Sequence, residues 1–447
     1  MDTREKTGDS PTDGAGFPRF AGDSEWKPPA YTELGYEMFL YSMGAELEEA
    51  IRFDEWVDDV RANGAYAFEA ARRGPQTPCV DVVREDGDTF SLLNFSSYNY
   101  LGLSTHPRVI TAAKAALDTS GLGAASSPVH GGTFEIHKAL EAELIDFVGL
   151  HGRGVSLFSS GYSVNTGTIS ACIRRGHYLV LDRSAHMSIL EGAQLSRAKL
   201  LYFRHNDVED LQRVLAGITE EDARILVCVE GVYSADGDTA PLRGIVDVAK
   251  RHKAMVLVDE AHSFLVAGPG GRGVCEAEGV LADVDLLVLT FSKAFGGVGG
   301  ALVARKEITR YVNWYARCRM FSCAIDPAVT GGILESLRIA RSPEGAARRS
   351  RAQANADSLR ERLAPFVDIG RTSSWIVPVL FGPDERAIPL FNFLQRKGLE
   401  GSIMMFPAVP KNEARIRLFV TSEHTTEQLD RCAELVKEAA DRFGFRR

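Results

Sequence analysis

The sequence contains no apolar run that approaches the roughly 20 residues of a membrane-spanning helix. Its longest apolar stretches, such as residues 254–258 and 285–291, have the length of buried strands. Residues 1–30 are polar and rich in Gly, Pro and Asp, without the apolar core that a signal peptide needs. We therefore expect a cytoplasmic protein with no membrane span, and we interpret residues 1–32 as a disordered leader.

The sequence also lacks an excess of basic residues and paired cysteines. Its 51 Lys and Arg residues are outnumbered by 60 Asp and Glu residues, and the net charge of -9 argues against a nucleic-acid-binding protein. The 7 cysteines are scattered and form no C-x-x-C pair. Neither a zinc knuckle nor a disulfide framework is indicated, so we expect reduced cysteines and no metal site.

The length of 447 residues and the hydrophobic content of 45% suffice for a large domain and a smaller one, each with its own core. Residues 33–95 form a distinct N-terminal region. The spacing of apolar residues over 36–71 predicts a helical arm that ends at a Gly-Pro pair. Residues 79–83 and 89–93 flank the turn-forming residues 85–88, and together they predict a β-hairpin.

Between residues 96 and 335, helical segments alternate with short and almost wholly apolar strands. Parallel strands that are covered on both faces have this composition. The alternation predicts an α/β fold in which a large domain, 96–335, holds a mostly parallel sheet. A mixture of strands and helices over 336–447 predicts a smaller α+β domain. The strands predicted for the large domain are 155–158, 178–181, 199–203, 225–230, 255–259 and 286–290.

Two of these strands end in chemically unusual residues. The strand 255–259 ends at Asp259, and the strand 286–290 is followed by Ser292 and Lys293 before a run of glycines. In α/β sheets the reactive groups gather at the carboxyl ends of the strands. A lone lysine in such a loop is typical of a surface residue, but a carboxylate at the end of the neighbouring strand favours a shared chemical role.

Pyridoxal phosphate requires this combination of groups. It needs a lysine with which to form an imine, a carboxylate that keeps its ring nitrogen protonated, and hydrogen-bond donors around its phosphate. We predict that Lys293 forms the imine and that Asp259 pairs with the ring nitrogen. The predicted phosphate donors are Thr290, Ser292 and the turn formed by Ser160, Gly161 and Tyr162.

Over residues 94–424 the sequence resembles the α-oxoamine synthase family, a group of fold-type-I pyridoxal-phosphate enzymes. The resemblance rests on short motifs that are weak individually but occur in the order in which the family has them. They include Asn99-Tyr100-Leu101-Gly102-Leu103, Phe158-Ser159-Ser160-Gly161-Tyr162, Ala185-His186-Met187-Ser188, Glu230-Gly231-Val232-Tyr233-Ser234, Phe321-Ser322-Cys323-Ala324 and Ala414-Arg415-Ile416-Arg417.

The resemblance implies roles for residues around the cofactor. His186 would stack on the pyridine ring, which completes a catalytic set with Lys293, Asp259 and His262. Ser234 and His262 would hydrogen-bond the phenolic oxygen of the cofactor or the substrate. Ser322 would reach the phosphate site of a second subunit, which implies a homodimer with the active site at its interface.

The resemblance also implies how the substrate binds. Arg417 would hold the carboxylate of the amino acid, a task that suits a planar bidentate donor, and Asn99 would contribute to the same site. Because side chains alternate along a strand, Arg415 and Arg417 should point to opposite faces. We expect Arg415 to be the one that faces solvent.

The reaction that the resemblance implies is a decarboxylating condensation of a small α-amino acid with an acyl thioester, which yields an α-amino ketone. Lys293 would remove the Cα proton as a general base. Coenzyme A or a carrier protein could carry the acyl group. The alternatives are another fold-type-I reaction, such as transamination or retro-aldol cleavage, and a non-catalytic partner subunit, which typically lacks the lysine.

Overall fold

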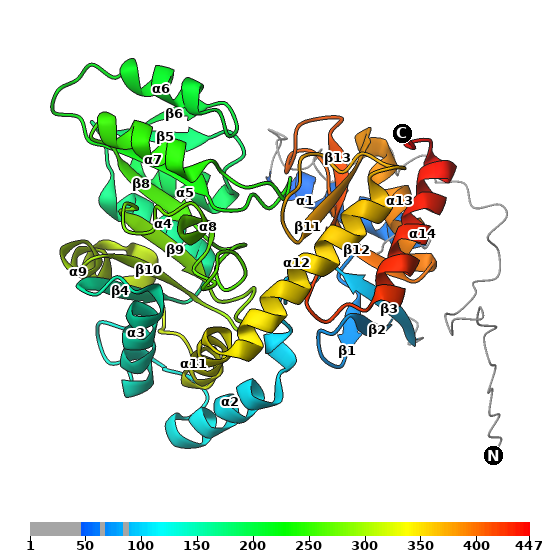
Figure 1. Ribbon diagram of the computed structural model, residues 1–447, viewed down its shortest axis with the longest axis horizontal. Coiled ribbons are helices and arrows are strands. Elements are labelled where there is room, and N and C mark those ends of the chain that lie inside the picture. The colour runs from blue at the N-terminus through cyan, green and yellow to red at the C-terminus, as the bar shows by residue number, and fades with distance from the viewer. Residues whose placement is uncertain (1–45, 63–67, 84–88) are drawn as a thin grey trace.

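The computed structural model describes residues 46–62, 68–83 and 89–447. The expected leader, 1–32, and the expected turn, 85–88, lie outside the described residues. Two β-sheets organise the described part of the chain, and Figure 1 shows them in two units that the long helix α12 connects.

The larger sheet has seven strands in the order β4-β10-β9-β8-β7-β5-β6. Neighbouring strands are parallel except at β10, which is antiparallel to both β4 and β9. The prediction of a mostly parallel sheet is confirmed, and all six predicted strands are present. The strands are β4 (Arg153–Phe158), β5 (Tyr178–Asp182), β6 (Lys199–Phe203), β7 (Ile225–Glu230), β8 (Met255–Asp259), β9 (Leu286–Thr290) and β10 (Gly300–Arg305).

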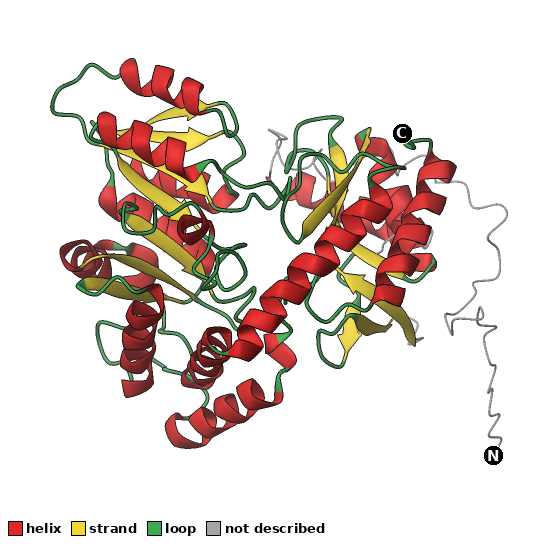
Figure 2. Ribbon diagram, viewed as in Figure 1, coloured by secondary structure: helices red, strands yellow, loops and turns green. Residues whose placement is uncertain are grey.

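Helices cover this sheet on both faces, and the strand sequences show why (Figure 2). In β7, Leu226 and Cys228 join one apolar cluster, which includes residues of α4 and α5. Val227 and Val229 join a second cluster, which includes residues of α6 and α7. Alternate side chains thus enter two cores, which is why a covered strand is apolar throughout. The helices of this unit are α2 (Pro107–Ser120), α3 (Glu135–Val148), α4 (Gly161–Cys172), α5 (Met187–Ser196), α6 (Val208–Ala216), α7 (Leu242–Arg251), α8 (Val274–Ala277), α9 (Lys306–Tyr315), α10 (Arg317–Met320) and α11 (Pro327–Arg341).

The smaller sheet has six strands in the order β1-β2-β3-β12-β13-β11. The predicted hairpin is confirmed, since β2 and β3 pair antiparallel. It does not stand alone, because β3 pairs in parallel with β12 from the C-terminal region, with Leu93 opposite Leu399. The elements of this unit are β1 (Ala71–Arg73), β2 (Cys79–Val83), β3 (Thr89–Phe95), α12 (Pro343–Leu363), β11 (Ile376–Gly382), α13 (Ala387–Arg396), β12 (Leu399–Met404), β13 (Ala414–Phe419) and α14 (Thr426–Phe443).

The helix predicted over 36–71 is wrong at its C-terminal end. The structure has α1 over Glu46–Ala62, bends at 68–69 and an edge strand, β1, from Ala71 onward. Ala71 and Arg73 pair with β2, so backbone pairing within the sheet determines the conformation of this segment. The boundary predicted between the large and small domains, at residues 335 and 336, falls inside α11.

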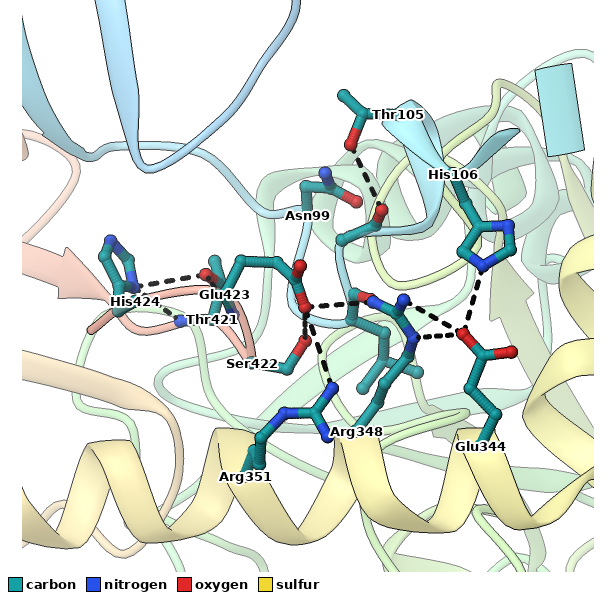
Figure 3. Close-up of polar contacts among 12 residues, drawn as sticks. Asn99, Thr105, His106, Glu344, Arg348, Arg351, Thr421, Ser422, Glu423 and His424 are labelled. Atoms are coloured by element: carbon teal, nitrogen blue, oxygen red, sulfur yellow. Dashed lines mark hydrogen bonds and ion pairs between the residues drawn. The ribbon is translucent and has the colours of Figure 1, made fainter. Parts of the chain in front are cut away.

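An ion-pair network on α12 joins the two units (Figure 3). Arg348 donates to Glu423 Oε1 at 2.9 Å and to the carbonyl oxygen of Leu101 at 2.9 Å. It also pairs with Glu344 at 3.0 Å, and Glu344 in turn contacts His106 Nε2 at 3.0 Å. A single guanidinium therefore connects α12 to the start of the large unit and to the loop that precedes α14.

We expect Arg348→Met to lower the free energy of unfolding by about 1–3 kcal/mol, because it leaves partly buried acceptors unsatisfied. Arg351→Met is the matched control. Arg351 is on the same helix and its guanidinium lies 3.9 Å from Glu423, but its side chain is 52% exposed, against 13% for Arg348. The control should change the free energy by less than about 0.5 kcal/mol. Equal losses for the two variants in urea denaturation would contradict the role given to Arg348.

Candidate active site

The parallel strands place three predicted or motif residues at one edge of the larger sheet. Glu230 ends β7, Asp259 ends β8 and Thr290 ends β9. Glu230 and Asp259 are direct neighbours in the strand register. His186 follows β5, on the other side of β7, so the sheet order β9-β8-β7-β5 sets the order of these groups in space.

Asp259 is a buried carboxylate, 4% exposed, that is held by two donors. Asn165 Nδ2, from α4, donates to Oδ2 at 2.6 Å, and the backbone N–H of Ala261 donates to Oδ1 at 2.9 Å. Hydrogen bonds of this kind offset the cost of burying a charge. The same amide of Asn165 donates to Ser188 Oγ at 2.9 Å, which links the carboxylate to the helix that begins after His186.

Lys293 lies in the turn after β9, within the field of this carboxylate. Burial lowers the pKa of its amine, while the nearby carboxyl groups of Asp259 and Glu230 act in the opposite direction. Its Nζ lies 6.0 Å from the centre of the Tyr98 ring. A lowered pKa increases the share of neutral amine, which is the form that can attack a carbonyl or accept a proton.

His186 is fixed by its backbone as well as by its ring. It caps α5, because its Nδ1 accepts from the backbone N–H of Ser188 at 3.3 Å; Nδ1 also lies 2.8 Å from Ser188 Oγ, and the backbone N–H of His186 donates to Glu230 Oε1 at 2.7 Å. Burial lowers the pKa of the imidazole, although Asp259 opposes this effect. Burial and the neighbouring Asp259 raise the pKa of Glu230 well above its ordinary value. Glu230 is therefore favoured as a neutral acid that anchors the His186 backbone.

The Ser160 turn forms an anion site at the N-terminus of α4. Ser160 caps this helix by accepting from Ser163 N at 3.1 Å, and the helix N-terminus favours negative charge. Residue 161 must be glycine, because a Cβ there would lie 2.1 Å from Thr290 Oγ1. Because residue 161 approaches Thr290 this closely, the two predicted groups of phosphate donors lie side by side and form one cradle. Thr290 itself is 7% exposed.

Other predicted cofactor residues lie nearer the surface. Ser292 is exposed, Tyr162 is 39% exposed, and Ser234 and Ser322 are partly exposed. Phe321, next to Ser322, is 82% exposed. The single chain thus leaves one side of the predicted phosphate site uncovered.

His262 follows β8 and is held on two sides. Its Nδ1 lies 2.7 Å from the hydroxyl of Tyr100, and its carbonyl oxygen accepts from Trp375 Nε1 at 3.0 Å. Burial, followed by the positive charges of Lys293 and Arg417, lowers the pKa of His262 well below its ordinary value. The imidazole is thus favoured in its neutral form, with Nε2 left to contact a ligand.

Arg417 comes from β13 of the smaller sheet and is 8% exposed. It donates to the carbonyl oxygen of Ser234 at 3.0 Å and to Ser402 Oγ at 2.8 Å. Its Nε is buried and has no hydrogen-bond partner among the described residues. No carboxylate pairs with it within that part of the chain, so it can accept the carboxylate of a ligand. Asn99 is 9% exposed and accepts from Ser104 N at 3.2 Å, near the network of Figure 3.

The prediction that Arg415 faces solvent is wrong. Arg415 is 2% exposed and forms ion pairs with Asp236 and Glu413. Alternation along the strand holds, but both faces of β13 are covered, so both arginines are buried.

Asp236 also belongs to a group with His205 and Asp238 whose spacing could suit a metal ion.

His205 is better described as a cation in an ion-pair network. Burial lowers its pKa, but hydrogen bonds to Asp182 and Asp238 outweigh this effect and raise the pKa to about 10. The two contacts measure 2.8 and 3.0 Å. An imidazolium has no lone pair for a metal.

The described residues fit pyridoxal phosphate. Lys293 is an amine of lowered pKa, Asp259 is a buried carboxylate, and Gly161 and Thr290 form a cradle with a helix N-terminus. Sequence reasoning did not assign site roles to Asn165, Glu230 or Tyr100. The signal was present, since Tyr100 and Glu230 occur inside motifs and Asn165 follows one by three residues, but their partners come from distant elements.

The fold and the site together define a fold-type-I, pyridoxal-phosphate-dependent transferase. The family model described as aminotransferase class I and II matches residues 91–436. An 8-amino-7-oxononanoate synthase of Thermoanaerobacter pseudethanolicus is 33% identical over 84% of this chain and 93% of that protein. One of Alkaliphilus metalliredigens is 35% identical over 86% of this chain and 95% of that protein.

Solved structures give the same result. A serine palmitoyltransferase from S. paucimobilis superposes with a TM-score of 0.81 at 35% identity, over 88% of this chain and 98% of that chain. One from Sphingomonas wittichii has a TM-score of 0.80 at 34% identity, with the same coverage. The protein belongs to the α-oxoamine synthase family of pyridoxal-phosphate-dependent acyltransferases. Among the described residues, no helix combines the length and apolar character that a membrane crossing requires.

We expect Gly161→Ala to weaken binding of pyridoxal phosphate by about tenfold or more, because the new methyl group forces Thr290 out of the cradle. Gly217→Ala, at the C-terminus of α6, is the control, since its Cβ would be an ordinary contact distance of 3.4 Å from the carbonyl oxygen of Val214. Cofactor affinity is measured by titration of visible absorbance. An affinity unchanged in Gly161→Ala would place the phosphate elsewhere.

Proposed function

We propose that this protein joins the carbonyl carbon of an acyl thioester to the α-carbon of a small amino acid, using the residues described above. The observation that carries the proposal is the meeting at one site of Lys293, the buried Asp259 and Arg417, which has no carboxylate partner among the described residues. Family membership supports the same reaction class. Bound pyridoxal phosphate supplies an electron-accepting ring that stabilises negative charge at the substrate Cα.

Each residue has a separate task in this proposal. Asp259, held by Asn165, would pair with the ring nitrogen of the cofactor. His186 would cover one face of the cofactor ring, and its own position is set by the hydrogen bond from its backbone to Glu230. Arg417, whose guanidinium pairs with no carboxylate of the described residues and whose Nε lacks a partner among them, binds the amino acid carboxylate.

Lys293 moves the proton at Cα. Its lowered pKa provides a neutral amine that can accept this proton and later return it. The new carbon–carbon bond forms as the carbon–sulfur bond breaks, and the thiolate takes a proton from solution. Loss of carbon dioxide from the former amino acid is followed by protonation at Cα, so the products are an α-amino ketone, carbon dioxide and a thiol.

We propose that the active protein is a homodimer. The exposed side chains of Phe321 (82%), Leu122 (81%) and Met187 (53%) are large and apolar. Phe321 adjoins Ser322, and Met187 adjoins His186, so a partner that covers them would also close the exposed side of the cofactor site. Ser322 would then contact the phosphate bound by the second subunit.

The reaction is tested with carboxyl-labelled glycine, alanine and serine, each combined with acyl thioesters of coenzyme A or of a carrier protein. We expect labelled carbon dioxide and free thiol in equal amounts from one amino acid, and neither product from Lys293→Ala. Conversion of the amino acid into a 2-oxo acid without thiol release would identify a transaminase instead. Absence of turnover with intact cofactor binding would favour a non-catalytic subunit.

We expect Arg417→Met to raise KM for the amino acid about 10- to 100-fold, because a charge-assisted hydrogen-bond pair is lost. Arg415→Met is the comparison on the same strand. It removes the buried ion pairs to Asp236 and Glu413, so it should lower the melting temperature more than it raises KM. A normal KM in Arg417→Met would contradict the assignment of the carboxylate site.

A further inference from the structure

A second cavity, of about 580 Å³, lies between α12 and the segment 266–278. None of the catalytic, cofactor or substrate residues proposed above lines it. Its volume is within the range of small-molecule sites in proteins. The cavity therefore has room for a ligand that is separate from the amino acid and the cofactor.

Arg349, on α12, brings a positive charge to this cavity. It is partly buried, and one of its terminal nitrogens donates to the carbonyl oxygen of Ala340 at 2.7 Å. It forms no ion pair with any carboxylate in the described part of the chain. Its side chain lines the cavity, and the negative charge of Glu276 acts on it without an ion pair, raising the pKa that burial lowers.

Other arginines with little exposure use their donors differently. Arg348 and Arg415 pair with carboxylates. Arg153 donates to the carbonyl oxygens of residues 282, 284 and 285, and Arg319 donates to those of residues 157 and 313. Arg349, like Arg417, forms no ion pair with a carboxylate of the described residues, and it is to Arg417 that we assign the carboxylate of the amino acid. A partly desolvated guanidinium with unused donors favours an oxyanion.

The other residues that line the cavity indicate which groups, besides an oxyanion, a ligand would carry. Val232, Val266, Val274 and Trp375 provide an apolar wall. Hydroxyl groups of Thr239, Ser350 and Ser373 also line the cavity. Two carboxylates also line the cavity, and neither forms an ion pair with Arg349: Asp357 pairs with Arg360, and Glu278 is exposed to solvent.

We propose that this cavity is a second binding site, for a small organic anion whose carboxylate pairs with Arg349 and whose apolar part lies against Trp375. The site is independent of the reaction proposed above, because it shares no residue with it. Trp375 also donates to the carbonyl oxygen of His262 at 3.0 Å, so the ligand would lie one side chain away from the active site.

The test is calorimetric titration of the holoenzyme with hexanoate. We expect saturable binding that is at least tenfold tighter than that of acetate, which lacks the apolar part, and of 1-hexanol, which lacks the charge. Arg349→Met should weaken hexanoate binding at least tenfold, while the cofactor absorbance and the activity stay unchanged. Ala354→Phe is a second variant, which fills the cavity from the exposed face of α12 without removing a charge.

Arg417→Met shows whether hexanoate occupies the active site instead. Hexanoate affinity retained in Arg417→Met but lost in both Arg349→Met and Ala354→Phe supports the proposal. Affinity lost in Arg417→Met, retained in either cavity variant, or absent from the unmodified holoenzyme overturns it. None of these outcomes depends on turnover, so a failure here is distinguishable from a failure of the proposed reaction.

Discussion

The buried carboxylate of Asp259 is the constraint on which the arrangement of the site depends. A charge at 4% exposure is unfavourable unless donors surround it, and two groups of the described residues donate to it: the Asn165 amide and the Ala261 N–H. The first requires α4 to lie against the end of β8, and this helix also carries the phosphate cradle. The position of one carboxylate thus determines where the two ends of the cofactor can be bound.

The site also requires that the smaller sheet lies close to the edge of the larger sheet at which Asp259 ends β8. Arg417 reaches the carbonyl oxygen of Ser234, and Arg415 pairs with Asp236, so two side chains of β13 hold the loop that follows β7. The ion pairs of Arg348 join the units at another point. The proposed site for the substrate carboxylate depends on these contacts, because they fix the two sheets together.

The sequence predicts the larger sheet well because each of its covered strands is apolar along its whole length, as β7 and β9 are. It does not predict β10, which follows a glycine run and inserts antiparallel between β4 and β9. The pairing of β3 with β12 joins segments about 300 residues apart, and no local pattern reports such a contact. The burial of Arg415 was missed for the same reason, because its partner Asp236 lies in the other unit.

In the candidate site, too, some residues could be predicted from the local sequence and others depend on contacts between distant segments. Lys293 and Asp259 could be found from the sequence because each stands at the end of an apolar strand, whereas the neutral state of Glu230 depends on its tertiary surroundings. Burial and the adjacent Asp259 raise the pKa of Glu230 well above its ordinary value, which favours its neutral form. Its carboxyl group also acts on Lys293, because together with Asp259 it opposes the lowering of the pKa of the amine by burial. Glu230 thus holds His186 in place through a hydrogen bond and, with Asp259, limits how far the pKa of Lys293 falls.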